Sequence, residues 1–249
     1  KNEIFLLKLS GDPPQITPIS TPIPLPTPAP GKKNLVEIVH GANSSPSAWP
    51  NDMKNEISSR VDSSWNVETY DWSEDASVGL KITRAIPPSL DHGINLGKQT
   101  AENNYEHVHL IGHSAGAWLI DLAAEQLKHD KPNTKIHLTF LDAFCPEELS
   151  KDLAEEKYTT WSDNYYVKDM LLFTQTNLPN SHNVNLNNLD PEFNSHSFPH
   201  EWYFDTIISL MTIGADKYGF IRSLEGGGID EWGRSLTSSE FRRGNKAVN

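Results

Sequence analysis

One segment of the 249-residue chain has the residue types and the spacing of a nucleophilic centre. Residues 112–116 read Gly-His-Ser-Ala-Gly; a strand-like run, Val-His-Leu-Ile, precedes them, and apolar residues at helical spacing follow. A serine between two glycines at a strand-to-helix junction is typical of a nucleophile elbow, because the tight turn needs small neighbours and lifts the hydroxyl above the sheet edge. The pattern therefore predicts Ser114 as a nucleophile.

A serine hydroxyl needs a base to take its proton, and the base needs an acid to hold its tautomer. In an elbow of this kind the acid and the histidine follow the serine in chain order. Placement favours His196, because it lies on a loop before a predicted helix that starts at Pro199. His200 stays as the alternative, although it already lies in the first turn of that helix. Three further histidines are predicted at a helix end, inside a strand and in an Asn-rich loop: His129, His137 and His182.

Two aspartates are candidates for the acid. Asp142 ends an apolar predicted strand, residues 136–141, which brings it to the same sheet edge as Ser114. A buried carboxylate without a partner is costly, so we expect Asp142 to have one. Asp169 follows a later short strand, residues 164–167, and is the alternative.

The reaction also needs two backbone N–H groups that face the charge developing on the substrate oxygen. The N–H of Ala115 lies directly after the nucleophile at a helix N-terminus, where the helix dipole also favours negative charge. A His-Gly-Ala sequence at the end of an early predicted strand offers the second N–H. We therefore predict an oxyanion hole formed by Ala42 and Ala115.

The elements that position these residues alternate along the chain. Predicted strands are 35–39, 66–72, 108–111, 135–141 and 164–167, and predicted helices are 115–128 and 201–213. Strands that alternate with helices predict an α/β fold, with a mainly parallel sheet covered by helices on both faces.

The N-terminal part of the chain has a different amino-acid composition. Eight of the 17 prolines fall in residues 13–30, which contain no charged residue, and this favours a semi-rigid extended spacer. Residues 4–9 resemble a short strand. We expect residues 1–33 to be a stub and a Pro/Thr-rich linker, and residues 34–249 to be the globular domain. Because the chain begins with Lys, we also expect it to be part of a longer polypeptide.

Composition excludes several classes of function. The formal net charge of −12 argues against nucleic acid and anionic membranes as partners, and the single cysteine, Cys145, excludes an internal disulfide framework. No apolar run approaches the roughly 20 residues of a membrane span, so no integral membrane segment is expected. The histidines form no metal-ligand motif, and we expect neither metal nor organic cofactor. The compartment stays open, with the spacer favouring an extracellular or cell-surface location.

Several motifs occur together in order: residues 39–43 (VHGAN) and Trp49, then 70–72 (YDW), 107–117 (HVHLIGHSAGA) and 141–143 (LDA). Over about residues 34–205 this arrangement resembles the pancreatic-lipase-like group of lipases and phospholipases in the α/β-hydrolase superfamily. The resemblance implies an α/β-hydrolase fold.

In that group the acid follows the strand after the elbow, which implies Asp142. The group's catalytic histidine precedes a tyrosine by seven positions, as His196 precedes Tyr203. The chain departs from the group at Ala42 and Ala115, where the lipases often have an aromatic residue and a leucine. The acyl preference is therefore not implied.

The predicted function is a serine hydrolase that cleaves carboxylic esters, esterase or lipase in type, through an acyl-enzyme on a Ser114–His196–Asp142 triad. Its substrate would be a small-molecule or lipid ester. The loop between Asp169 and His196 either covers the site or is an ordinary packed loop. Two alternatives are a catalytically silent hydrolase-like module, used for binding or at a surface, and an acyltransferase that uses the same triad.

Overall fold

The computed structural model describes residues 20–21, 24–168, 177–189, 196–208, 219–220 and 245–247. These parts form a seven-stranded sheet with the strand order β2-β1-β3-β4-β5-β6-β7, and every neighbouring pair is parallel. The strands are β1 (Asn34–Val39), β2 (Trp65–Tyr70), β3 (His107–His113), β4 (Lys135–Leu141), β5 (Trp161–Tyr166), β6 (His182–Asn185) and β7 (Asn245–Ala247).

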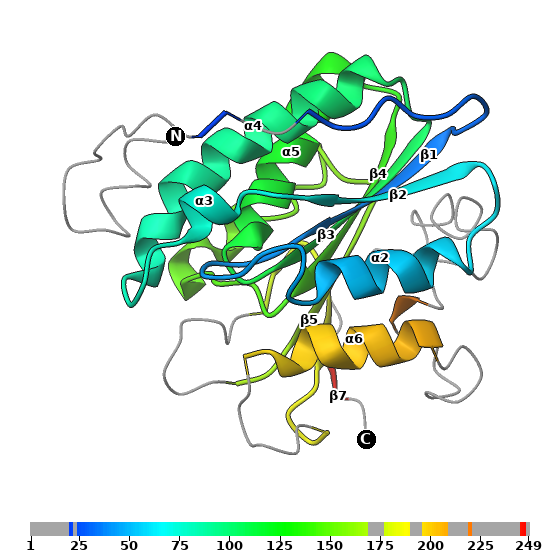
Figure 1. Ribbon diagram of the computed structural model, residues 1–249. Helices are drawn as coiled ribbons and strands as arrows, with labels where there is room; N and C mark the ends of the chain where they lie inside the picture. The colour runs from blue at the N-terminus through cyan, green and yellow to red at the C-terminus, as the bar shows by residue number, and fades with distance from the viewer. Residues whose placement is uncertain are drawn as a thin grey trace.

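Helices cover both faces of this sheet. Figure 1 shows α3, α4 and α5 on one face and α2 and α6 on the other. This arrangement confirms the predicted fold class, an α/β-hydrolase fold with a parallel sheet between helical layers. The helices are α2 (Pro50–Ser58), α3 (Ser73–Ala76), α4 (Ile86–Glu102), α5 (Gly116–Asp130) and α6 (Phe198–Ile208), with short 3₁₀ segments η1 (Ile82–Ala85) and η2 (Glu147–Asp152).

The central strands are buried on both faces, so each contributes to two apolar cores. In β1, Leu35 and Val39 face the core beneath α4 and α5, whereas Val36 and Ile38 face the core beneath α2 and α6. Side chains alternate across a strand, and a strand buried on both faces therefore carries an almost continuous apolar run. The polar exceptions in β1 are Asn34, at its start, and Glu37, which is fully buried.

The structure differs from the sequence prediction at strand β6. His182 begins this strand and does not lie in a loop. The neighbouring Asn183 satisfies the preceding turn from within the strand, since its side-chain amide accepts from Leu178 N–H and donates to the carbonyls of Leu178 and Ser181. An asparagine-rich stretch can therefore be a strand here. The strand predicted at residues 4–9 and the part of the last helix beyond residue 208 lie outside the described residues.

Part of the proline-rich segment contacts the α3–α4 side of the molecule. The N–H and hydroxyl of Ser20 both donate to the Asp75 carboxylate in α3, at 2.8 and 2.7 Å. The N–H of Leu25 donates to the Gln99 side chain in α4 at 2.9 Å. In Figure 1 this segment, drawn in dark blue, runs past α4. Among the described helices, none is long and apolar enough to cross a membrane.

Candidate active site

Ser114 lies in a sharp turn between β3 and α5. Strand β3 ends at His113, α5 begins at Gly116, and Ser114 has a φ of +53°, in the left-handed region that side chains rarely adopt. The flanking glycines allow this turn: a Cβ on Gly112 would lie 2.7 Å from the Gly116 carbonyl oxygen, and one on Gly116 would lie 2.6 Å from the His40 carbonyl oxygen. The turn can be this tight only without side chains at those two positions.

Asp142 lies at the same edge of the sheet, one strand along. The β3–β4 register pairs His113 with Leu141, so the residues that follow each strand, Ser114 and Asp142, emerge together. Asp142 is fully buried and is also in the left-handed region, with a φ of +49°. Its Oδ1 accepts from the N–H of Val167 at 3.1 Å. The carboxylate is therefore anchored by the chain that leaves β5.

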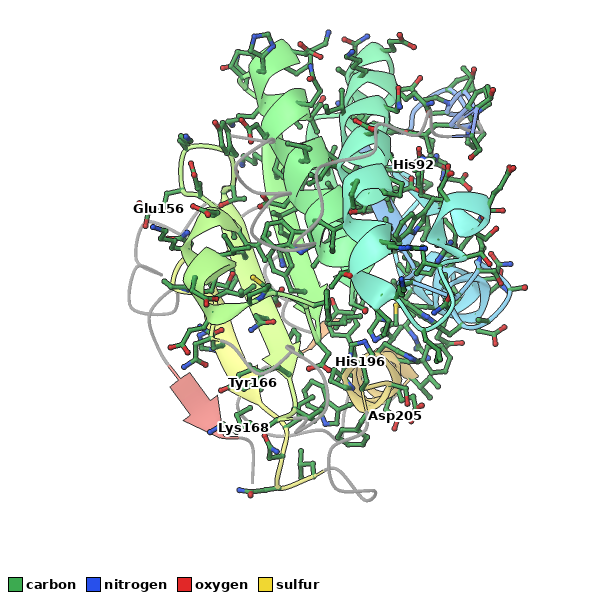
Figure 2. All side chains as sticks on the ribbon, turned by 90° about the vertical axis from the view of Figure 1, so that its left-hand side faces the viewer. His92, Glu156, Tyr166, Lys168, His196 and Asp205 are labelled. Atoms are coloured by element: carbon green, nitrogen blue, oxygen red, sulfur yellow. The ribbon has the colours of Figure 1, made fainter. Side chains whose placement is uncertain are left out.

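His196 contacts the other oxygen of the Asp142 carboxylate. It lies just before α6 (Figure 2), with its side chain 23% exposed, and its Nδ1 is 2.6 Å from Oδ2 of Asp142. With an ionised carboxylate as acceptor, Nδ1 carries the proton, which leaves Nε2 to act as a base. The structure records no hydrogen bond between the Ser114 hydroxyl and His196, although both are described. Such contacts are often long without substrate and tighten when it binds.

The structure describes one of the two alternative residues, His200, but not the other, Asp169. Asp169, the other candidate acid, lies outside the described residues. His200 lies in the first turn of α6 and stacks on Trp49, with ring centroids 4.6 Å apart. Burial, together with the proximity of His196, lowers the pKa of His200 to about 4. None of the described carboxylates forms an ion pair with it, so His200 has the surroundings of a packed aromatic residue.

The predicted oxyanion-hole residues approach Ser114 from two sides. Ala115 is buried and is the N-cap of α5, so its N–H is at the positive end of the helix dipole. The loop that contains Ala42 is pressed against the serine, since a Cβ on Gly41 would lie 2.7 Å from the Ser114 Cβ. Within the described part of the chain, neither alanine N–H donates a hydrogen bond. Neither N–H group is therefore committed to another hydrogen bond in the described part of the chain.

Asn43, to which the sequence analysis gave no role, holds this loop in place. Its φ is +55°, its Oδ1 accepts from the N–H groups of Val78 and Gly79, and its Nδ2 donates to the Gly79 carbonyl. Asparagine tolerates the left-handed region better than most residues. The sequence signal that could have indicated this role is an asparagine directly after a His-Gly-Ala turn.

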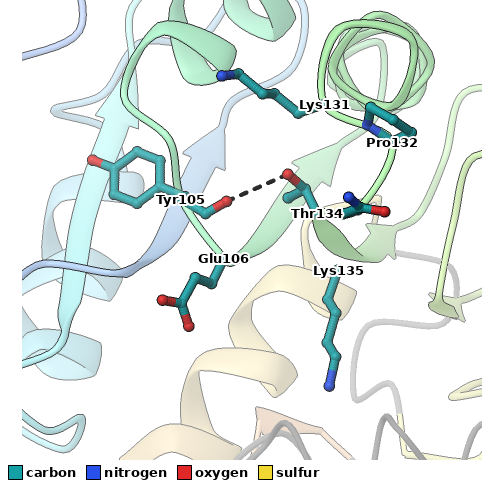
Figure 3. Close-up of a pocket in the computed structure, with 7 residues that line it drawn as sticks. Tyr105, Glu106, Lys131, Pro132, Thr134 and Lys135 are labelled. Atoms are coloured by element: carbon teal, nitrogen blue, oxygen red, sulfur yellow. Dashed lines mark hydrogen bonds between the residues drawn. The ribbon is translucent and has the colours of Figure 1, made fainter.

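Other features of the described residues lie outside this arrangement. A pocket of about 400 Å³ (Figure 3), lined by residues 105–106 and 131–135, lies where β3 and β4 begin. The seven-residue strands separate it from Ser114 by roughly 20 Å. Cys145 is buried, and burial raises the pKa of its thiol. No group of three His, Cys, Asp or Glu side chains in the described ranges is placed to bind a metal ion.

Comparisons with known proteins give structural likeness only. No family model and no curated protein matches the sequence. The similar solved structures include a "predicted CIB-like hydrolase" from Thermoplasma acidophilum, at 14% identity and a TM-score of 0.45, covering 73% of this chain and 88% of that one. They also include a Pyrobaculum calidifontis esterase, at 12% identity and a TM-score of 0.36, covering 96% of this chain and 91% of that one. At these values the likeness says nothing about substrate.

Proposed function

We propose that this protein is a serine hydrolase that cleaves carboxylic esters. The observation that carries the proposal is the 2.6 Å contact between His196 Nδ1 and the buried carboxylate of Asp142, at the sheet edge where Ser114 occupies its strained turn. A buried carboxylate that orients a partly exposed imidazole beside a serine is the arrangement that activates a hydroxyl. Residues 34–249 would form the catalytic domain.

In the proposed reaction, Ser114 Oγ attacks the ester carbonyl carbon while His196 Nε2 takes its proton. Asp142 stabilises the imidazolium that results, and the N–H groups of Ala42 and Ala115 bind the negative oxygen of the tetrahedral intermediate. Collapse of that intermediate breaks the bond to the leaving alcohol, which takes the proton from His196. Water, activated by the same histidine, then attacks the acyl-enzyme and releases the acid and the free serine.

A fluorophosphonate probe tests the proposal directly, because it labels only an activated serine. We expect the folded wild type to be labelled and to hydrolyse nitrophenyl esters, and Ser114→Ala to lose labelling and at least about 10³-fold in kcat. Circular dichroism of both proteins is the control for folding. A folded wild type without labelling or turnover would show that the module is catalytically silent.

The same assay narrows the substrate. Nitrophenyl esters of short and long acids, each tested alone and with an added alcohol, separate three activities. Preference for short acids indicates an esterase, preference for long acids indicates a lipase, and formation of a new ester with the alcohol indicates acyl transfer.

A further inference from the structure

His113, the residue before the proposed nucleophile, contacts the proposed base. Its side chain is buried, and its Nε2 lies 3.0 Å from the backbone carbonyl oxygen of His196. The two imidazole rings are also close, with centroids 4.6 Å apart. A carbonyl oxygen can only accept, so Nε2 of His113 carries the proton and donates it to this bond.

Neighbouring groups hold the His113 ring in that orientation. Its centroid is 4.9 Å from that of His200 and 6.0 Å from that of Trp49, both in edge-to-face geometry, and Trp49 and His200 stack on each other. On the other side, His113 Nδ1 lies 3.1 Å from where a Cβ on Gly41 would be. The ring therefore fills the space between the loop that contains Gly41 and the start of α6. It cannot turn without moving one of these two segments.

His113 also remains neutral. Burial lowers the pKa of His113 well below its usual range, and the nearby imidazoles of His196, His200 and His40 lower it further. The Nε2–H group is thus a neutral donor in the folded protein near neutral pH. A neutral ring does not oppose the positive charge that His196 acquires when it takes the serine proton.

We propose that His113 is a positioning residue for His196. Its Nε2–H holds the His196 backbone at the sheet edge, so that the imidazole stays in reach of Asp142 and Ser114 at once. Among the described residues, Asp142 and His113 are the two that hydrogen-bond His196, one through its ring and one through its backbone. The inference rests on the ester hydrolase function proposed above, and it adds a second function to the Gly-His-Ser-Ala-Gly segment.

Substitutions that move the donor test this role. In His113→Gln the amide nitrogen can occupy the place of Nε2, whereas in His113→Asn it is too short to do so and in His113→Leu no donor remains. We expect kcat to fall up to about 100-fold in the Asn and Leu variants, with KM changed less than about threefold, because the base is misplaced while substrate binding is not. His113→Gln should restore most of the lost turnover.

A spectroscopic readout separates positioning from general loss of packing. The proton between His196 Nδ1 and Asp142 should give a far-downfield ¹H resonance in the wild type, assigned by its loss in Asp142→Asn. We expect that resonance to persist in His113→Gln, and to broaden or disappear in the Asn and Leu variants. His200→Leu is the matched control: it removes a ring from the same cluster but no hydrogen bond to His196, so the resonance should persist.

Either of two results would overturn the inference. One is that folded Asn and Leu variants keep both the resonance and the wild-type kcat. The other is that all three His113 variants and His200→Leu lose activity in proportion to their fall in Tm. If fluorophosphonate does not label the wild type, the ester hydrolase proposal fails, but the resonance still decides whether His113 holds His196.

Discussion

At the level of single residues, the proposed acid can be distinguished from its rival by a conservative change. Asp142→Asn keeps the shape of the side chain but reverses the hydrogen bond to His196, so the imidazole would hold the wrong tautomer. We expect kcat to fall by about 10⁴-fold, as a tautomer error does in a serine triad. Asp169→Asn is the matched control, with a change of less than about threefold. Steady-state kinetics on a nitrophenyl ester measures both, and equal losses would contradict the assignment.

A second residue, Glu37, concerns stability rather than catalysis. It is fully buried in β1, and neither carboxylate oxygen has a hydrogen-bond partner among the described residues. Burial, and then the nearby Glu68, raise the pKa of Glu37 well above its usual range. The folded protein therefore keeps a proton that the unfolded chain releases above about pH 4.3, and stability contributed by this group is lost as the pH rises.

Replacing Glu37 by an apolar residue of similar size should therefore stabilise the fold. We expect Glu37→Met to raise the free energy of unfolding by about 1–3 kcal/mol at pH 8, and by less at pH 5.5, since the proton that folded Glu37 must hold is bound less readily from solution as the pH rises. Glu37→Gln should gain less, because its amide is also buried without partners. Urea unfolding at the two pH values measures this difference, and a larger gain at pH 5.5 would contradict it.

At the level of elements, helices α4 and α5 approach through two glycines. A Cβ on Gly93 would lie 2.6 Å from the Leu119 carbonyl oxygen, and one on Gly97 would lie 2.7 Å from both the Ala123 carbonyl oxygen and the Gln126 Cβ. The two glycines lie one turn apart on one face of α4, and this face receives the backbone of α5. Helix propensity and helix packing thus oppose each other at these positions.

Substitution at Gly97 measures which effect is larger. Alanine normally stabilises a helix by about 1 kcal/mol relative to glycine, whereas overpacking costs about 1–3 kcal/mol. We expect Gly97→Ala to lower the free energy of unfolding, because the nearest atom is backbone and cannot move aside. Lys98→Ala, at the exposed neighbouring position, should change it by less than about 0.5 kcal/mol. A Gly97→Ala protein more stable than wild type would show that the helices separate freely.

Helix α4, which contains these glycines, illustrates why some elements can be predicted from the sequence and others cannot. The strand before Ser114 and the helix after it were predicted because their signals are local: an apolar run, a Gly-x-Ser-x-Gly turn and helical spacing. Helix α4 was not predicted, and it contains Pro87, Pro88 and two glycines, which are residue types that usually disfavour helices. In the folded protein the prolines lie in its first turn, where they lack no hydrogen bond, and the glycines meet α5. Only the tertiary contact makes these residues favourable.

Strand β5 shows that strands, too, cannot always be predicted from the local sequence. The predicted strand begins at residue 164, whereas β5 begins at Trp161 and includes the polar Asp163, which is almost fully buried. Its carboxylate accepts from Thr139 and Tyr165 and contacts His137, at 2.6, 2.9 and 3.1 Å. A polar residue with all these partners is compatible with a central strand, but the partners come from β4 and β5 together and no local pattern contains them.

For the whole molecule, the buried histidines determine how stability depends on pH. Burial is the largest cause that lowers the pKa of each of five histidines, to about 2 for His107 and to about 4 for His200. Their imidazoles are neutral in the folded protein but take up protons in the unfolded chain below about pH 6.5. The five are His40, His107, His109, His113 and His200.

The sign of the effect follows from proton binding in the two states. A base with a lowered pKa contributes stability above its unfolded pKa of about 6.5, and that stability is lost as the pH falls, by about 1.4 kcal/mol per pH unit for each proton taken up on unfolding. Glu37 and Asp121 oppose this trend, because burial raises the pKa of each, to about 7 for Asp121, but they are two groups against five. We therefore expect the free energy of unfolding to fall steeply between pH 6.5 and 5. Urea unfolding at half-unit intervals measures the slope, and a flat profile there would mean that these imidazoles are not held neutral.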